Sequence, residues 1–308
     1  MGPTASGKTD LAIALADHFP IEIINVDSAQ IYLGMDIGSG KAPLALLDKV
    51  PHHLMSFLDP AIPYSAAQFR TDALKMIADI IQRKKLPVLV GGSMLYFKAL
   101  QEGLSSLPSA SQEVRANLEK EALELGWAHL HARLKEIDPT AANRISPNDP
   151  QRISRALEIN QLTGEPMSAW IQKNDKPKSD YAFVNIGLIP ELTPRAILHD
   201  RIEKRFDAML ELGLITEVER LFGRSDLHRN LPSMRTVGYR QVWEYLLKET
   251  TFETMREKAI AATRQLAKRQ LTWLRSWPNL ETVDFYENPL PETIKKLIGF
   301  PISSYPKN

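Results

Sequence analysis

The chain opens with a loop whose residue types are suited to binding phosphate groups. Residues 2–9, GPTASGKT, match the pattern G-x-x-x-x-G-K-[ST] at every fixed position. In such a loop the glycines let consecutive backbone N–H groups point at one anion, and the following helix adds the positive end of its dipole. The lysine adds a charge, and the final hydroxyl can bind Mg²⁺. We therefore expect a diphosphate at Gly2, Pro3, Thr4, Ala5, Ser6, Gly7, Lys8 and Thr9, with Thr9 as the metal ligand.

A carboxylate follows the first predicted strand. The β-branched run at residues 21–26 ends at Asp27. In open parallel sheets, functional side chains gather at the carboxyl ends of the strands. Asp27 is therefore expected beside the phosphate loop, where a carboxylate can accept a proton. The alternative is that Asp27 only caps a turn with Ser28.

Helices and strands alternate around these residues. Apolar spacing at 11, 15 and 19 predicts a helix after the loop, and Ser65 with Gln68 forms a capping box for a helix over 65–86. A short strand over 86–90 then stops at Gly91-Gly92. The pattern predicts an α/β fold with a P-loop NTPase-like parallel sheet core. Such a loop normally follows a strand, and the sequence starts one residue before it, so we expect one central strand to be missing.

The character of the chain changes near residue 109. Residues 111–137 are rich in Glu, Ala, Leu and Arg, which predicts helix, and Asp149-Pro150 and Gly164 mark the ends of another helix. Residues 174–180 predict a linker, and a strand follows over 181–189. We therefore expect a helical insertion domain at 109–180 within a catalytic core formed by 1–108 and 181–308. Further helices are predicted over 194–212, 232–247 and 252–277.

Bulk composition narrows the function classes. A length of 308 residues suggests about two domains, and a net charge of +1 means that nucleic acid must bind to a local patch. The chain has no cysteine, which excludes disulfides and thiolate zinc sites. The adjacent His52 and His53 lack the spacing of a metal site and are interpreted as structural. No membrane segment is apparent, so we expect a monomeric, cytoplasmic protein.

The phosphate loop alone leaves several functions open. Most such loops bind ATP or GTP, and those proteins usually carry a Mg²⁺-binding Asp after a later strand. Here the strand over 86–90 ends in Gly-Gly-Ser instead, which argues weakly against nucleotide hydrolysis. The GSGK sequence at 38–41 is interpreted as a turn. A P-loop nucleotide kinase or NTPase remains the main alternative, and a non-catalytic RNA-binding factor is the third.

Several further segments point to one family. In chain order the segments are GPTASGKT at 2–9, DSAQIY at 27–32, PHHL at 51–54, YSAAQFR at 64–70, GGSMLYFKAL at 91–100, NDPQRISRALE at 148–158, RIEKRF at 201–206, VGYRQVW at 237–243 and ATRQLAKRQLTWLR at 262–275. Together they resemble the tRNA dimethylallyltransferases (tRNA isopentenyltransferases) of bacterial type, over nearly the whole chain. The departures are small: GSGKA at 38–42 stands where the family commonly reads GTAKP, and Ser93 stands where threonine is frequent.

The resemblance implies a reaction and its participants. A dimethylallyl group would pass from dimethylallyl diphosphate to N6 of adenosine 37, beside the tRNA anticodon, with Mg²⁺ as cofactor. Asp27 would accept the proton from N6, Lys8 and the loop amides would bind the diphosphate, and Thr4 would touch the reacting centre. Arg205 is expected to contact the diphosphate, although its spacing also allows a solvated pair with Glu203 or Asp207.

The last long helix carries the strongest local positive charge. Residues 255–277 contain six basic residues against one acid, and Trp273 and Trp277 offer surface for base stacking. A solvated basic face with buried tryptophans, or a membrane-surface helix, are the alternatives. With the family resemblance, we expect tRNA contacts at Asp27, Ser28, Ala29, Gln30, Ser93, Arg115, Gln151, Arg152, Ile153, Ser154, Arg155, Arg235, Gly238, Tyr239, Arg240, Lys268, Arg269 and Arg275.

Overall fold

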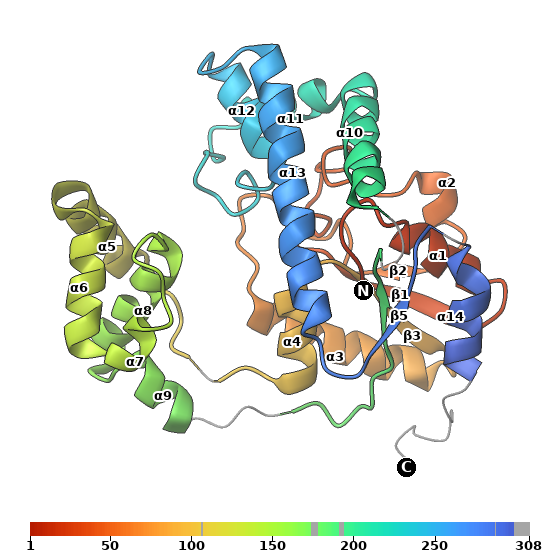
Figure 1. Ribbon diagram of the computed structural model, residues 1–308, viewed down its shortest axis with the longest axis horizontal. Helices are drawn as coiled ribbons and strands as arrows, with labels where there is room; N and C mark the ends of the chain where they lie inside the picture. The colour runs from red at the N-terminus through yellow and green to blue at the C-terminus, as the bar shows by residue number, and fades with distance from the viewer. Residues whose placement is uncertain (106, 174–177, 191–193, 287, 299–308) are drawn as a thin grey trace. The chain divides into compact units, whose positions relative to one another are not determined.

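The computed structural model describes residues 1–105, 107–173, 178–190, 194–286 and 288–298 (Figure 1). It divides into two compact units, one formed by Met1–Gln101 with Asp180–Asn308 and the other by Glu102–Ser179. All but the last residue of the predicted insertion, 109–180, belongs to the second unit, and residues 174–177 of its predicted linker lie outside the described residues.

A three-stranded parallel sheet forms the centre of the first unit. Strand β1 (Ile21–Val26) lies between β2 (His52–His53) and β3 (Leu86–Gly91). The register places Ile21 opposite Leu86 and Val26 opposite Gly91. The parallel sheet is as predicted, and the matched ends of β1 and β3 bring the residues that follow them to one edge of the sheet.

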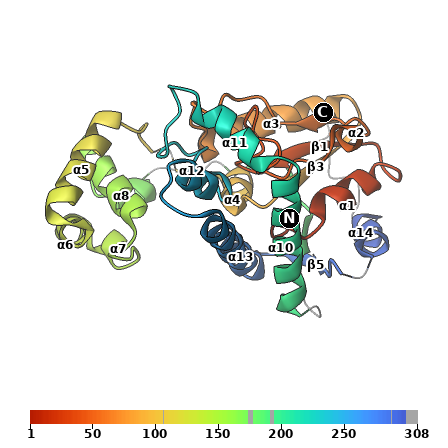
Figure 2. The ribbon, with the colours of Figure 1, turned by 90° about the horizontal axis from the view of Figure 1, so that it is seen from above.

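Helices cover both faces of this sheet because the side chains of β1 alternate between them. Ile24 and Val26 pack with α3 (Ala66–Gln82), while Ile21 and Ile23 pack with α1 (Lys8–Leu15) and α14 (Pro289–Ile298). Both views show α3 and α1 on opposite sides of β1 and β3 (Figure 1, Figure 2). The Ser65–Gln68 capping box is present at the start of α3, which confirms that prediction.

A second, two-stranded parallel sheet joins distant parts of the chain. It pairs β4 (Asn185–Leu188) with β5 (Leu280–Val283). The backbone of Met1 adds to its edge: its amino group donates to Ile186 O at 2.7 Å, and Leu188 N donates to Met1 O at 2.9 Å. The phosphate loop therefore starts beside β4.

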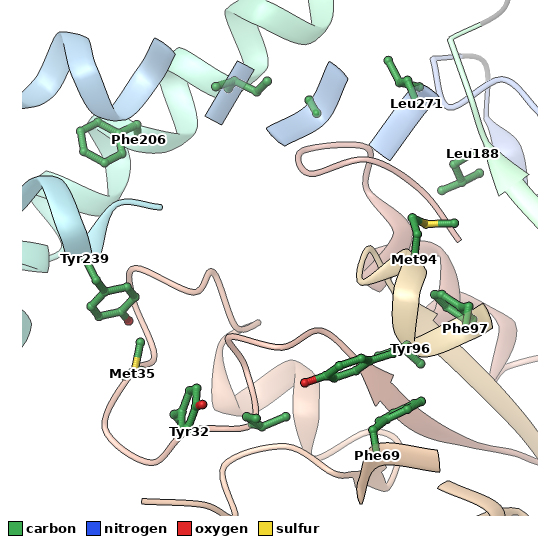
Figure 3. Packing of buried hydrophobic residues seen from close by; sticks show 14 of the residues in the cluster. Tyr32, Met35, Phe69, Met94, Tyr96, Phe97, Leu188, Phe206, Tyr239 and Leu271 are labelled. Atoms are coloured by element: carbon green, nitrogen blue, oxygen red, sulfur yellow. The ribbon is translucent and has the colours of Figure 1, made fainter. Parts of the chain in front are cut away.

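The remaining helices of the first unit form one packed group with the sheet. They are α2 (Leu44–Leu47), α4 (Met94–Glu102), α10 (Arg195–Glu211), α11 (Leu214–Phe222), α12 (Tyr239–Leu246) and α13 (Phe252–Arg275). Except in α2, their buried side chains share a core with α3, in which Tyr239 lies near Met35 and Phe69 stacks on Tyr96 (Figure 3). Sequence periodicity missed α11, α14 and β5, and it predicted the helix at 232–247 seven residues too early.

The second unit is a small helical bundle with a core of its own. Its helices are α5 (Gln112–Leu125), α6 (Trp127–Ile137), α7 (Pro139–Ala142), α8 (Pro150–Thr163) and α9 (Met167–Lys173). The single helix predicted over 111–137 is two helices, because Gly126 adopts φ +82° and ends the first. Asp149 caps α8 and Gly164 ends it in a left-handed conformation, both as predicted.

Candidate active site

The sequence-predicted phosphate loop and Asp27 line the same cleft. The cleft has a volume of about 410 Å³. Its walls come from the phosphate loop, β1 and the turn after it, residues 39–43, residues 52–55, the end of β3, and α10. It also has cationic residues in its wall that the sequence did not single out as site residues, namely Arg201 and Lys204.

The phosphate loop has the backbone geometry that its glycines predict. Gly7 adopts φ +80° and caps α1, which begins at Lys8. Ala5 also has a positive φ, +62°. Lys8 Nζ donates to Pro3 O at 3.1 Å, so the ammonium group lies over the loop. Positive φ values in the loop and a lysine ammonium group beside it are features of an anion site.

Three charges interact across the cleft. Burial lowers the pKa of Lys8 to about 8, and the nearby Asp27 carboxylate partly opposes this shift. Burial likewise lowers the pKa of Arg205, again opposed by Asp27. Two desolvated cations beside one carboxylate leave the cleft with positive charge to spare, which favours an anionic ligand.

Asp27 forms a turn and also faces the cleft. Its Oδ1 accepts from Ala29 N at 2.9 Å. Among the described residues no hydrogen bond to Oδ2 is found, and the side chain lines the cleft wall. The turn-capping alternative is therefore correct for one oxygen, while the other remains available for chemistry.

The turn after β1 is fixed to the turn after β3. Ser28 N donates to Ser93 Oγ at 2.9 Å, and Ser93 Oγ donates to Ser28 Oγ at 3.2 Å. Asn25 Nδ2 adds a bond to Leu54 O at 2.9 Å. The Asp27 backbone is thus held from both neighbouring strands, so its carboxylate has a defined position.

Arg205 reaches the phosphate loop across the cleft. Its Nη1 donates to Thr4 Oγ1 at 3.3 Å and its Nη2 to Gly40 O at 3.1 Å. The alternative pairing of Arg205 with Glu203 or Asp207 is not observed, because Arg256 binds both acids and Arg264 binds Glu203. The guanidinium therefore points into the site and not into solvent.

Residues 36–40 form a turn that depends on a buried carboxylate. Glu217 on α11 is 7% exposed and accepts from the backbone N–H of Asp36, Ile37 and Gly38 at 2.9, 2.8 and 3.0 Å. Tyr239 OH donates to the same carboxylate at 2.6 Å. The turn predicted at 38–41 is confirmed, and Glu217 is a residue that sequence reasoning missed. An acid at a buried position of an amphipathic helix was the available signal.

The predicted tRNA contacts of the first unit differ in exposure. Lys268, Arg269 and Arg275 are exposed on α13 and form no ion pair within the described part of the chain. Arg264, by contrast, donates to Glu203 at 2.8 Å. Trp273 is 37% exposed, but Trp277 is 8% exposed and packs against Phe97, so only the first can offer a stacking surface.

The predicted tRNA contacts near α12 and at the sheet edge also differ in exposure. Arg235 and Arg240 are exposed, as is Ser28, while Ala29 and Ser93 are partly buried. Tyr239 is fully buried against Glu217, which corrects the expectation that its side chain meets RNA, and Gly238 beside it has φ +93°. Gln30 is also buried and donates to Ser39 O and Gly40 O, both at 3.3 Å, so it supports the turn that holds Arg205.

Two of the predicted tRNA contacts in the second unit bind another buried acid. Glu158 on α8 is fully buried and binds Arg115 at 2.9 Å and Arg155 at 2.6 Å. Ile153 is likewise buried, so its side chain belongs to the core and is not available to tRNA. The rest of the predicted set, Gln151, Arg152 and Ser154, lies at least partly exposed, with Arg152 paired to Asp149.

The described part of the chain holds neither a clustered metal site nor a membrane-spanning helix. Within the described residues, no group of three or more His, Cys, Asp or Glu side chains could hold a metal ion, and His53 instead binds Glu22 at 2.6 Å. Among the described helices, none has the length and apolar character needed to cross a membrane.

The chain is similar to proteins of one family over most of its length. A family model described as IPP transferase matches residues 30–277. A tRNA dimethylallyltransferase of Thioalkalivibrio sulfidiphilus is 56% identical over 284 residues, which cover 92% of this chain and 88% of the relative. One from Burkholderia cenocepacia is 55% identical over 287 residues, with the same coverage.

Solved structures of similar proteins have the same fold. A tRNA isopentenylpyrophosphate transferase from Bacillus halodurans superposes with a TM-score of 0.69 at 37% identity, covering 97% of this chain and 94% of that one. A eukaryotic dimethylallyltransferase, whose structure captures it acting on tRNA, gives a TM-score of 0.75 at 26% identity over 95% of this chain and 76% of its own.

Proposed function

The chain belongs to the IPP transferase family, and we propose that it transfers a dimethylallyl group from dimethylallyl diphosphate to N6 of adenosine 37 in tRNA. The products are N6-isopentenyladenosine and diphosphate. Family membership favours this prenyl transfer over the nucleotide kinase alternative, which shares only the phosphate loop and the α/β core.

One observation carries the proposal: a loop suited to diphosphate and a carboxylate with a free oxygen face one cleft. Lys8 belongs to the loop and Arg205 contacts it at Thr4, and Asp27 is close enough to both cations to influence their pKa values. A prenyl transfer to an amine needs this combination, namely cations for the leaving group and a proton acceptor for the nucleophile.

The proposed step assigns each residue a role. The exocyclic amine of adenine attacks C1 of the dimethylallyl group, the N6–C1 bond forms, and the bond from C1 to the diphosphate oxygen breaks. Asp27 accepts the proton that N6 loses. Lys8, the loop amides and Arg205 stabilise the negative charge that develops on the departing diphosphate. Thr4, whose hydroxyl accepts from Arg205, lies at the edge of this charge.

A magnesium ion fits the residues at the loop. Mg²⁺ prefers oxygen ligands and usually binds through one or two protein oxygens with the remainder from phosphate and water. The Thr9 hydroxyl and the carboxylates of Asp10 and Asp27 line the cleft and supply such oxygens. We propose Thr9 as the protein ligand; the ion would neutralise charge on the diphosphate.

The tRNA is proposed to bind along exposed cations of both units. In the first unit these are Arg235, Arg240, Lys268, Arg269 and Arg275, and in the second Arg115 and Arg152, beside the partly buried Arg155. Adenine must leave its stack to reach a cleft, which costs less in a loop than in a duplex. An anticodon-loop adenosine meets this requirement.

A single incubation tests the proposal. The protein is mixed with unmodified tRNA, Mg²⁺ and dimethylallyl diphosphate, and the nucleosides are then analysed by mass spectrometry. We expect N6-isopentenyladenosine at position 37 with one diphosphate released per modified tRNA. A parallel incubation with ATP tests the kinase alternative: ADP release without any prenylated nucleoside would overturn the proposed function.

A further inference from the structure

Gln270 is a buried polar residue on the helix that carries the proposed tRNA-binding cations. It lies on α13 between the exposed pair Lys268 and Arg269 and the exposed Trp273, yet it is only 7% exposed itself. A buried amide costs free energy unless both of its ends form hydrogen bonds. Where those bonds go therefore indicates what the residue does.

Both ends of the Gln270 amide bind the active-site loops. Thr4 N donates to Gln270 Oε1 at 2.8 Å, and Gln270 Nε2 donates to Gly92 O at 3.0 Å. The two partners define the orientation of the amide, because a backbone N–H must face oxygen and a carbonyl must face NH₂. One side chain of α13 thus joins the phosphate loop to the turn after β3.

The local sequence leaves space for this contact. A Cβ at position 92 would lie 2.3 Å from Gln270 Nε2 and 3.2 Å from Gly2 O. A Cβ at position 91 would lie 1.9 Å from Val26 O. The Gly-Gly pair that replaces the aspartate of nucleotide hydrolases therefore allows β1, the phosphate loop and α13 to approach one another.

The same turn also reaches the proton acceptor. Ser93, the next residue, binds the backbone and hydroxyl of Ser28, which follows Asp27. The bonds from Gln270 through Gly92 and Ser93 to Ser28 connect three parts of the site: α13, the turn of Asp27 and the phosphate loop. Figure 1 shows α13 passing the strands and ending near α4, where Lys98 lies over the ring of Trp273.

We propose that Gln270 is a positioning residue. From α13, the proposed tRNA-binding helix, it fixes the conformation of the phosphate loop. It fixes the Thr4 backbone and with it the shape of the loop that receives diphosphate, and it makes the geometry of that loop depend on the position of α13. Binding of tRNA on α13 and binding of prenyl diphosphate in the loop then share a coupling free energy, which is reciprocal. The inference rests on the proposed function, because it takes a prenyl diphosphate as the occupant of the loop.

The experiment compares variants that differ only in the amide. Gln270→Met keeps the volume and removes both bonds, while Gln270→Glu keeps the acceptor for Thr4 N but loses the donor to Gly92 O. Gln265→Met, at an exposed position of the same helix, is the matched control. For each protein we measure the Kd of the unreactive dimethylallyl S-thiolodiphosphate, with and without an anticodon stem-loop RNA, and kcat and KM with reactive substrates.

We expect Gln270→Met to weaken binding of the analogue and to lower kcat by about 10- to 100-fold, as loop misplacement does in other active sites. The Kd for the stem-loop alone should stay within about twofold of the wild type, and the stem-loop should no longer improve analogue binding. Gln265→Met should match the wild type in every value. Hydrogen exchange of residues 2–7 adds a readout on folded Gln270→Glu protein. There the carboxylate faces Gly92 O, and this repulsion weakens its bond to Thr4 N, so faster exchange is expected.

Three results would overturn the inference. The first is a Gln270→Met protein that binds the analogue as tightly as the wild type. The second is a Gln270→Met protein that loses stem-loop and analogue binding equally. The third is a wild-type protein whose affinity for the analogue does not change when the stem-loop is present. If Gln270→Met does not fold, unchanged exchange in Gln270→Glu overturns it instead. Failure of the wild type to bind the analogue at all would reject the proposed function as well, so the two failures are distinguishable.

Discussion

At the scale of single residues, one carboxylate serves two purposes in this site. Asp27 accepts a backbone hydrogen bond with Oδ1 and presents its other oxygen to the cleft. An asparagine can reproduce the first contact but cannot accept a proton from N6. The two roles can therefore be separated by substitution.

We expect Asp27→Asn to lower kcat by about 10²–10⁴-fold while the Kd of the thiolodiphosphate analogue stays near that of the wild type. Asp27→Ala should lose the same catalysis and also loosen the turn. Single-turnover kinetics measure the chemical step. A wild-type single-turnover rate in Asp27→Asn would remove Asp27 from the role of proton acceptor.

Lys8 makes diphosphate binding depend on pH. Because burial lowers its pKa to about 8 in the free protein, the ammonium group loses its charge as the pH rises through 8, where an ordinary lysine would keep it. We expect the Kd of the analogue to increase by up to about tenfold per pH unit above pH 8. Calorimetry between pH 7 and 9.5 checks this, with Lys8→Arg as the control that stays charged. A Kd of the wild type that does not change over this range would contradict the prediction.

At the scale of elements, the turn at 36–40 positions a guanidinium that comes from a distant helix. The Glu217 carboxylate on α11 accepts hydrogen bonds from the first amides of the turn. At the other end of the turn, Gly40 O accepts a hydrogen bond from Arg205. A Cβ at position 40 would lie 1.7 Å from Arg205 Nη2, so glycine is required for the contact as well as for its φ of +65°.

Gly40→Ala should therefore displace Arg205 and lower kcat/KM for dimethylallyl diphosphate by about tenfold or more. Gly34→Ala is the matched control, because Gly34 has φ +69° but no neighbouring atom within 4 Å of its added Cβ. Both variants share the backbone strain, and only the first meets Arg205. Equal activity in the two variants would show that the contact with Arg205 has no part in catalysis.

A second prediction at this scale concerns tRNA binding to the exposed face of α13. Reversing the charge of Lys268 and Arg269 should weaken tRNA binding and reduce the salt dependence of log Kd by roughly one unit of slope per lost phosphate contact. Lys75→Glu, at an exposed position on α3, introduces a charge reversal away from the proposed surface. Binding assays from 50 to 300 mM salt measure both slopes. A slope identical to that of the wild type would exclude these two residues as phosphate contacts.

At the scale of the whole molecule, a buried carboxylate links stability to pH. Glu22 on β1 is 3% exposed and is bound by Arg83 at 2.7 Å and by His53 at 2.6 Å. These bonds, with Arg83 the largest cause, lower its pKa from 4.5 to about 2. Because the folded-state pKa lies below the unfolded one, the stabilisation is present above about pH 4.5 and is lost as the pH falls toward 2.

We expect Glu22→Gln to lower the free energy of unfolding at pH 7 by about 2 kcal/mol, a value reduced for the solvent screening around Arg83. The difference from the wild type should shrink as the pH falls from 4.5 toward 2. Glu281→Gln, which removes an exposed pair with Lys296, is the control and should cost well under about 1 kcal/mol. Urea unfolding at several pH values measures these differences, and a constant difference down to pH 2 would contradict the assignment.

The sequence by itself determined the local features. A glycine-rich loop with Lys8 and Thr9, the capping box at Ser65 and the strands β1 and β3 follow from spacing and residue type, because loop conformation, capping and strand propensity depend mainly on near neighbours. The parallel direction of β1 and β3 follows from the predicted helix between them, since parallel strands need a crossover connection. Family motifs extended this to the reaction. The same reasoning placed Asp27 at the correct edge of the sheet.

Only the tertiary structure decided which distant side chains meet. Glu217, Gln270 and Gly40 are separated in sequence by many residues, and their contacts are hydrogen bonds between side chains and backbone groups far apart along the chain. Ile153, Tyr239 and Trp277 have residue types that suit RNA contact, but packing buries them. Burial and long-range hydrogen bonding depend on how all elements pack together, so no local pattern in the sequence specifies them.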